Sequence, residues 1–237
     1  MNHIEKTVRD FFEDANNVHP SGFLFHRYAS FDYCYNYFHP SRPQIVDDDN
    51  NMEKSCLVLG MYLASWGMYR GSGFLLKKIS IKHFKPIIEY IQVLRSEDKK
   101  VWKLDVDKYS DETIGKILGI YDDIKKELRI EEMGQKEHGT LVTKAMLGVF
   151  GIVPAFDTRF CDTFAKMYEK CGFSSKRLNK KSMECIRDFY EKNDKIIDDL
   201  SENNFIMDFR TGKPTKLKYS KAKIIDMYGF QKSTKSE

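Results

Sequence analysis

Several protein classes are excluded by what this 237-residue sequence lacks. It holds only six prolines, and no apolar run reaches the roughly 20 residues that a membrane-spanning helix needs. The longest such run, at residues 56–69, is typical of a buried core helix. The first residues show no basic segment followed by an apolar one, so no secretory signal is predicted. We therefore expect residence in the cytoplasm and no membrane partner.

Cysteine and histidine do not occur in the patterns that hold metals or build disulfide frameworks. The five cysteines are irregularly spaced and include no C-x-x-C pair, so reduced thiols are expected. The six histidines form neither H-E-x-x-H nor H-x₃-H. Phosphate-binding loops and the G-x-S-x-G elbow of serine hydrolases are missing as well. No metal and no cofactor are predicted.

What is present is the composition of a globular domain. The sequence is 41% hydrophobic, 31% charged and 14% aromatic, which predicts a packed core. Apolar residues recur three and four positions apart, which favours helices over short strands. We expect an all-α protein, a compact bundle of roughly eight to ten helices. Residues 1–230 should form a single domain, and residues 231–237 a frayed tail.

Local signals place several of the helices. Ser110, followed by acids in the first turn, predicts a helix over residues 110–128. Other helices are predicted at residues 2–16, from about residue 52, and at residues 83–94, 140–151, 182–200 and 221–228. The aromatic residues 23–38 could be a buried helix or a strand. Residues 152–155 should be extended because Pro154 disfavours helix before it, and Asp157 or Thr158 should cap a helix over residues 159–170.

Two residues in this region are candidates for a catalytic role. A carboxylate at Asp157 is favoured at the start of a helix, either as a cap alone or as a functional group that also caps. Lys144 stands among apolar residues in the helix predicted at residues 140–151. Its side chain could reach out to the surface, which the sequence favours, or stay partly desolvated. Desolvation lowers the pKa of an amine and makes it a better nucleophile toward an electrophilic carbon.

Residues 139–157 resemble the catalytic stretch of the helix-hairpin-helix DNA glycosylases, through Gly139-Thr140, Lys144 and the V-P-A-F-D segment that ends at Asp157. The resemblance covers about residues 134–170 and implies an all-helical fold. It also implies that Asp157 is the catalytic carboxylate, which stabilises positive charge on the sugar. Lys144 would be the amine that attacks the anomeric carbon in members with lyase activity. The implied function is excision of a modified base from double-stranded DNA.

Such an enzyme needs basic residues for the DNA backbone and flat side chains for an extruded base. The net charge is +4, and basic residues gather at residues 176–181 and 213–223. Trp66, Tyr69 and Arg70 are the predicted base pocket, from a glycine-rich stretch in which Arg70 beside Ser72 could instead be an ordinary surface arginine. Tyr28 and Trp102 are further aromatic candidates, or core residues. The predicted DNA-binding residues are Arg159, Lys176, Arg177, Lys180 and Lys181.

Two other functions remain open from the sequence. A non-catalytic helical module that binds nucleic acid or protein would have an exposed Asp157, interchangeable with asparagine. A small-molecule enzyme would have a deep apolar pocket around Trp66, Arg70 and Lys144.

Overall fold

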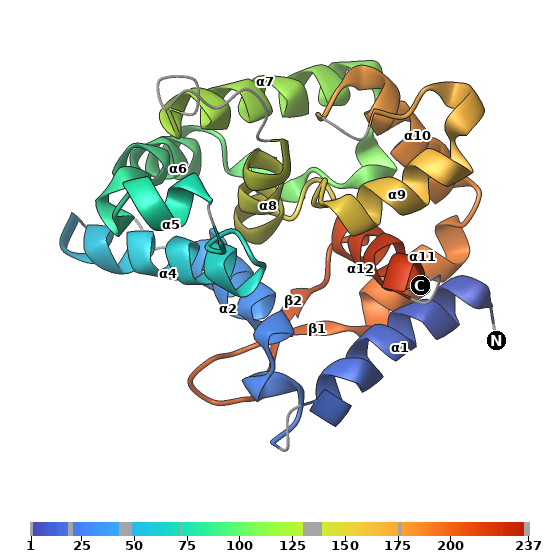
Figure 1. The fold of residues 1–237 in the computed structure, drawn as a ribbon, viewed down its shortest axis with the longest axis horizontal. Coiled ribbons are helices and arrows are strands. Elements are labelled where there is room, and N and C mark those ends of the chain that lie inside the picture. The colour runs from blue at the N-terminus through green and yellow to red at the C-terminus, as the bar shows by residue number, and fades with distance from the viewer. Residues whose placement is uncertain are drawn as a thin grey trace.

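The computed structural model describes residues 2–18, 21–42, 49–71, 73–129, 139–174 and 177–234. Eleven α-helices account for most of these residues, together with short 3-10 turns and one small two-stranded sheet (Figure 1). The all-α prediction is confirmed. The helices are α1 (His3–Val18), α2 (Ser30–Phe38), α4 (Met52–Ser65), α5 (Phe74–Lys78), α6 (Lys85–Glu97), α7 (Asp111–Glu127), α8 (Gly139–Phe150), α9 (Thr158–Met167), α10 (Lys180–Glu191), α11 (Asp194–Asn203) and α12 (Lys221–Thr234).

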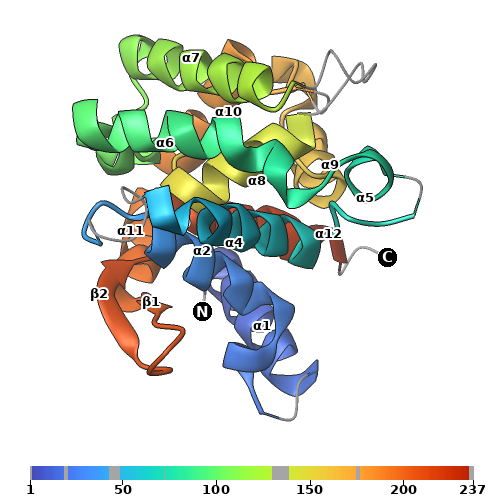
Figure 2. The same ribbon diagram turned by 90° about the vertical axis from the view of Figure 1, so that its left-hand side faces the viewer.

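Helix α8 lies near the centre of the molecule, where α2, α4 and α7 pack against it (Figures 1 and 2). Helix α12 is the second centre, and α1, α9 and α11 pack around it. The antiparallel strands β1 (Phe205–Met207) and β2 (Pro214–Lys218) form a hairpin beside α2. An extended connector, residues 151–157, leads from α8 to α9. This connector therefore joins the helices around α8 to those around α12.

The central position of α8 follows from its sequence. Every residue from Leu141 to Phe150 is buried, so the helix must be covered on all sides. Gly148 allows α4 to approach closely, because a Cβ atom at this position would lie 2.3 Å from a ring carbon of Tyr62.

Replacing Gly148 by alanine is expected to lower the free energy of unfolding by about 1–3 kcal/mol, because the Tyr62 ring is packed and must move. Gly119→Ala is the matched control, since Gly119 lies on the exposed side of α7 with no atom within 4 Å of the added methyl. There alanine should raise stability by up to about 1 kcal/mol through helix propensity. Urea denaturation measures both, and equal effects would contradict the close packing of α8 against α4.

Most helix ends lie where the sequence signals predict them. The Ser110 hydroxyl accepts a hydrogen bond from Thr113 N and caps α7. Helix α4 begins at Met52, and α8 ends before Gly151, whose φ of 70° reverses the chain. The aromatic residues 23–38 form two 3-10 turns and then α2, so the helical alternative is correct and the strand alternative is wrong.

Two predictions on the C-terminal part are wrong. Residues 182–200 do not form one helix, because α10 ends at Glu191 and α11 begins at Asp194. The Asn193 amide donates to Phe189 O (2.7 Å) and satisfies one of the last carbonyls of α10. The predicted frayed tail, residues 231–237, is wrong at its start, since α12 continues to Thr234 and the Gln231 side chain is buried against α1, where it bonds Asp14. Residues 235–237 lie outside the described residues. The hairpin of β1 and β2 was not predicted.

Candidate active site

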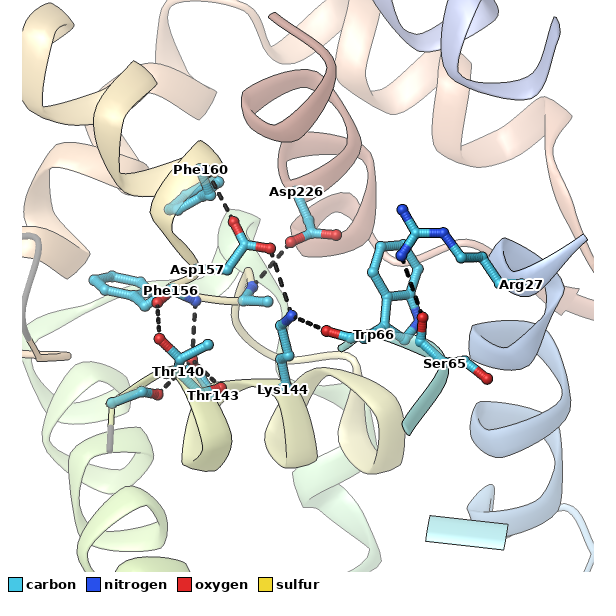
Figure 3. A network of polar contacts seen from close by, with 12 residues as sticks. Arg27, Ser65, Trp66, Thr140, Thr143, Lys144, Phe156, Asp157, Phe160 and Asp226 are labelled. Atoms are coloured by element: carbon cyan, nitrogen blue, oxygen red, sulfur yellow. Dashed lines mark hydrogen bonds and ion pairs between the residues drawn. The ribbon is translucent and has the colours of Figure 1, made fainter. Parts of the chain in front are cut away.

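Lys144 does not reach the surface, so the surface alternative favoured by the sequence is wrong. The residue is 5% exposed, and its Nζ donates to Trp66 O at 2.7 Å (Figure 3). Trp66 follows the last residue of α4, where helix carbonyls lack partners and a cation is favoured. Lys144 Nζ also lies 3.6 Å from Asp157 Oδ2. The connector between α8 and α9 therefore folds back and brings the two sequence candidates together as the Lys144–Asp157 pair.

Asp157 uses its two carboxylate oxygens differently. Oδ1 accepts a hydrogen bond from Phe160 N (3.0 Å), which confirms Asp157 as the N-cap of α9. Oδ2 faces Lys144, as the close-up shows (Figure 3). The side chain is 15% exposed, so the carboxylate lies at the edge of the interior. Capping alone requires only Oδ1, and the second oxygen is available for chemistry.

The backbone just before Asp157 is held from both sides. On the α8 side, Thr140 Oγ1 donates to Phe156 O (2.7 Å), and Phe156 N donates to Thr143 Oγ1 (2.9 Å). On the α12 side, Ala155 N donates to Asp226 Oδ1 (3.0 Å). These bonds connect consecutive residues of the connector to two different helices. The position of Asp157 is thus set by tertiary contacts as well as by its cap.

Asp226 belongs to a second buried ion pair. Its Oδ2 lies 2.7 Å from Lys223 Nζ, and the two residues are 5% and 2% exposed. The Lys223 ammonium lies 4.7 Å from the ring of Trp66 and 4.8 Å from that of Phe31, at distances typical of cation–π contacts. Lys144, Lys223 and Asp226 are therefore buried around Trp66 and the connector, and Asp157 lies at the edge of this cluster.

Burial and charge act in opposite directions on this cluster. Burial lowers the pKa of Lys144, while the negative charges of Asp157 and Asp226 raise it in part. Burial raises the pKa of Asp226, and Lys223 opposes that change. A depressed lysine pKa increases the share of the neutral amine, which is the nucleophilic form.

Aromatic side chains and arginines adjoin the Lys144–Asp157 pair. The Trp66 ring stacks on Tyr28 with centroids 5.2 Å apart and an interplanar angle of 7°. The Arg27 guanidinium lies 5.1 Å from the Tyr28 ring, and that of Arg159 lies 4.9 Å from Phe230, which contacts Trp66 edge-on. Arg70 packs alongside Gly67. We call Arg27, Arg70 and Arg159 the arginine rim.

The predicted base-pocket residues differ in exposure. Trp66 is buried, Tyr69 is half-buried and Arg70 is exposed. Within the described residues, Trp66 Nε1 and the Tyr69 hydroxyl are buried without a hydrogen-bond partner. Trp102, in contrast, is a core residue whose Nε1 donates to Val149 O at 2.8 Å. Ser72 lies outside the described residues.

Of the predicted DNA-binding residues that the structure describes, Arg159 lies two residues after Asp157, with its guanidinium over the Phe230 ring. Arg177 and Lys181 are exposed near and at the start of α10. Lys180 forms an ion pair with Asp111 of α7 at 2.9 Å. Lys176 lies outside the described residues, as do residues 134–138 of the glycosylase-like stretch. The described residues of the predicted basic stretch, Arg177, Lys180 and Lys181, thus belong to α10 and the segment before it, not to the elements that hold Lys144 and Asp157.

Sequence reasoning missed Lys223, Asp226 and Arg27. A signal for the first two exists, because they stand three apart among Ala222, Ile224, Ile225 and Met227 in a predicted helix. The same reasoning that singled out Lys144 among apolar neighbours applies to them. Arg27 carries no such signal.

The molecule also has a hollow away from this site. It measures about 570 Å³, lies at the C-terminal end of α9 beside Met167 and Cys171, and includes neither Lys144 nor Asp157. In the residues that the structure describes, no helix is long and apolar enough to cross a membrane. Those same residues contain no cluster of His, Cys, Asp or Glu that could hold a metal ion.

Comparison with known proteins finds no matching family model, curated protein or solved structure.

Proposed function

We propose that this protein is a DNA base-excision glycosylase that acts on a modified base, with Asp157 as the catalytic carboxylate. One observation carries the proposal: Lys144 Nζ and Asp157 Oδ2 lie 3.6 Å apart. These are the two residues that the glycosylase resemblance assigns to the chemistry. An N-cap does not need a buried lysine at its second oxygen, so the non-catalytic module leaves this contact without a role.

The proposed reaction breaks the bond between C1′ of the sugar and a nitrogen of the base. The base leaves with the electron pair and takes up a proton, while positive charge develops on the sugar. A carboxylate placed beforehand next to that charge lowers the barrier, and it does so most strongly where water is largely excluded. Asp157 meets these conditions, because its side chain is 15% exposed and tethered by its cap.

Lys144 can serve as the nucleophile in a combined glycosylase and lyase reaction. Its neutral amine donates a lone pair to C1′ and loses a proton as the base departs. Opening of the sugar ring, with the ring oxygen leaving as a hydroxyl, then produces a Schiff base. Burial lowers the pKa of Lys144 in the direction that this step requires. In the alternative, Lys144 only fixes Asp157 and the end of α4, and water attacks C1′.

Contacts with double-stranded DNA are proposed for the arginine rim. Arginine binds phosphate oxygens with paired hydrogen bonds. Arg27 lies over the ring of Trp66, Arg159 over that of Phe230, and Arg70 beside Gly67. An extruded base needs flat surface, for which the half-buried Tyr69 and the stacked, buried rings of Trp66 and Tyr28 are the aromatic candidates.

The test is incubation of the protein with duplexes that carry oxidised, alkylated, deaminated or bulky modified bases, followed by hot alkali to cleave abasic sites. Cleavage by the wild type and its loss in Asp157→Asn would support the glycosylase. If no duplex is cleaved, while DNA binding is the same for both proteins, the enzyme proposal is wrong and the non-catalytic module is favoured.

Borohydride decides the role of Lys144 on any duplex that is cleaved. Hydride reduces the Schiff base to a stable amine, so a covalent complex of protein and DNA is expected for the wild type and not for Lys144→Met. The control is Lys192→Met, because Lys192 is an exposed lysine paired with Asp188 on α10. Base release by the wild type without trapping would assign Lys144 to positioning only.

A further inference from the structure

The ion pair of Lys223 and Asp226 is not part of the catalytic assignment above, yet it contacts the site directly. Asp226 divides its two oxygens between the connector and α12: Oδ1 accepts from Ala155 N at 3.0 Å, and Oδ2 accepts from Lys223 Nζ at 2.7 Å. Ala155 is two residues before Asp157. One side chain of α12 therefore holds the connector before Asp157 on one side, opposite Thr140 and Thr143 of α8.

The same carboxylate is also an electrostatic neighbour of the Lys144–Asp157 pair. The charged groups that act on Lys144 include Asp157 at the start of α9, Asp226 from α12, and Arg70 from the segment after α4. The two aspartates also act on the buried Tyr62 of α4. Asp226 and Asp157 act on Lys144 with the same sign, and Arg70 acts with the opposite sign. Because Lys144, Asp157 and Asp226 are largely shielded from solvent, the charges of the two aspartates are weakly screened at Lys144, whereas water screens the charge of the exposed Arg70.

Lys223 explains why Asp226 can remain in the interior. A buried carboxylate without a cation would take up a proton and lose its charge. The Lys223 ammonium supplies that cation, and the rings of Phe11, Phe31 and Trp66 surround it at 4.7–5.4 Å. Trp66 in turn offers its carbonyl oxygen to Lys144. The lysines of both ion pairs thus contact Trp66, Lys144 at its carbonyl oxygen and Lys223 at its ring.

We propose that Asp226 is a positioning residue for the Lys144–Asp157 pair: it orients Asp157 through the Ala155 N–H and, paired with Lys223, supplies the buried negative charge that stabilises the Lys144 ammonium. Its catalytic consequence rests on the proposed glycosylase function. The electrostatic coupling does not, and it can be measured without any substrate.

The experiment follows the Nζ resonance of Lys144 through a pH titration in ¹⁵N-lysine-labelled protein, with the signal assigned from Lys144→Arg. In Asp226→Asn, Lys144 should lose its proton about one pH unit lower than in the wild type, because a nearby negative charge is gone. Asparagine keeps an oxygen for the Ala155 N–H. The matched control is Asp188→Asn, which removes an aspartate from the lysine pair of α10 and should leave the Lys144 titration unchanged.

Asp226→Asn leaves the buried Lys223 without its counter-charge, which could unfold the protein. A second variant therefore tests the same coupling without that unpaired charge. Lys223→Met combined with Asp226→Asn removes both charges and places an apolar side chain among the three rings, a replacement that buried ion pairs often tolerate. It should fold, as judged by circular dichroism, and shift the Lys144 titration in the same direction as Asp226→Asn but by less, because the positive charge of Lys223 is removed as well. An unchanged Lys144 titration in either folded variant would overturn the inference.

Activity adds a second readout where the wild type cleaves DNA. The pH at which borohydride trapping reaches half its maximum should fall with the Lys144 titration, while the rate of base release at its optimum falls because Asp157 is less well oriented. A uniform loss of activity with an unmoved pH profile would contradict the inference. If the wild type cleaves no duplex, the glycosylase proposal fails, and the titration still decides the role of Asp226.

Discussion

Replacing Asp157 by asparagine is expected to slow base release by a factor on the order of 10²–10³, the usual effect of removing one preorganised electrostatic group. The variant should still fold. Its amide oxygen can accept the hydrogen bond that Oδ1 now accepts from Phe160 N, and asparagine is as good an N-cap as aspartate. What it loses is the negative charge 3.6 Å from Lys144 Nζ.

Asp157→Ala separates the cap from the chemistry. It removes the charge and the cap together, so it should be about as inactive as Asp157→Asn but less stable than that variant by about 1 kcal/mol. Single-turnover kinetics on a cleaved duplex and urea denaturation measure the two effects. Equal activity of Asp157→Asn and the wild type would mean that the cap is the whole role of Asp157.

The stability of the protein is expected to fall as the pH rises from about 4 to about 7, because of Asp32. This residue is fully buried in α2, and burial raises its pKa to about 7. Tyr219 Oη, Met207 N and the charge of Lys223 oppose that rise. Over this interval the native state keeps a proton that the unfolded chain has released, so each pH unit costs up to about 1.4 kcal/mol of unfolding free energy.

Urea denaturation at pH 5 and pH 8 tests this expectation. Asp32→Asn should reduce the loss of stability between the two values, because the asparagine oxygen can accept from Met207 N and its amide can donate to the Tyr219 hydroxyl. Some decline should remain, because burial also raises the pKa of Asp105 to about 6. The control is Asp122→Asn, an exposed carboxylate on α7. Parallel pH profiles for the wild type and Asp32→Asn would rule out Asp32 as the cause.

Prediction from the sequence works best where the signal is local. The cap at Ser110, the glycine after α8 and the cap at Asp157 each depend on a few neighbouring residues, and the structure confirms all three. The prediction of one helix over residues 182–200 is wrong because apolar periodicity continues across the break. Asn193 ends α10 through a side-chain bond that the periodicity does not register.

In the candidate site, too, the residues with a local signal in the sequence are found and the others are not. Lys144 and Asp157 are found from the sequence because each has a local peculiarity, a charge among apolar residues or a carboxylate at a helix start. Arg27 is not found, because its relation to Trp66 connects residues 39 positions apart (66 − 27 = 39) that meet only when α4 and the turn before α2 pack together. The run Lys176 to Lys181 is conspicuous in sequence, yet Lys180 is paired with Asp111 on α7.

By itself the sequence determined the helical class, most helix ends and the two candidate catalytic residues, Lys144 and Asp157. These features depend on periodicity and caps, which act within one or two turns of chain. The tertiary structure decided that Lys144 is buried, that its ammonium meets Asp157, and that Asp226 and Lys223 complete the cluster. Those outcomes depend on how α4, α8, α9 and α12 pack around Trp66. Burial and charge neighbours are properties of that packing, and the pKa of Lys144 follows from them.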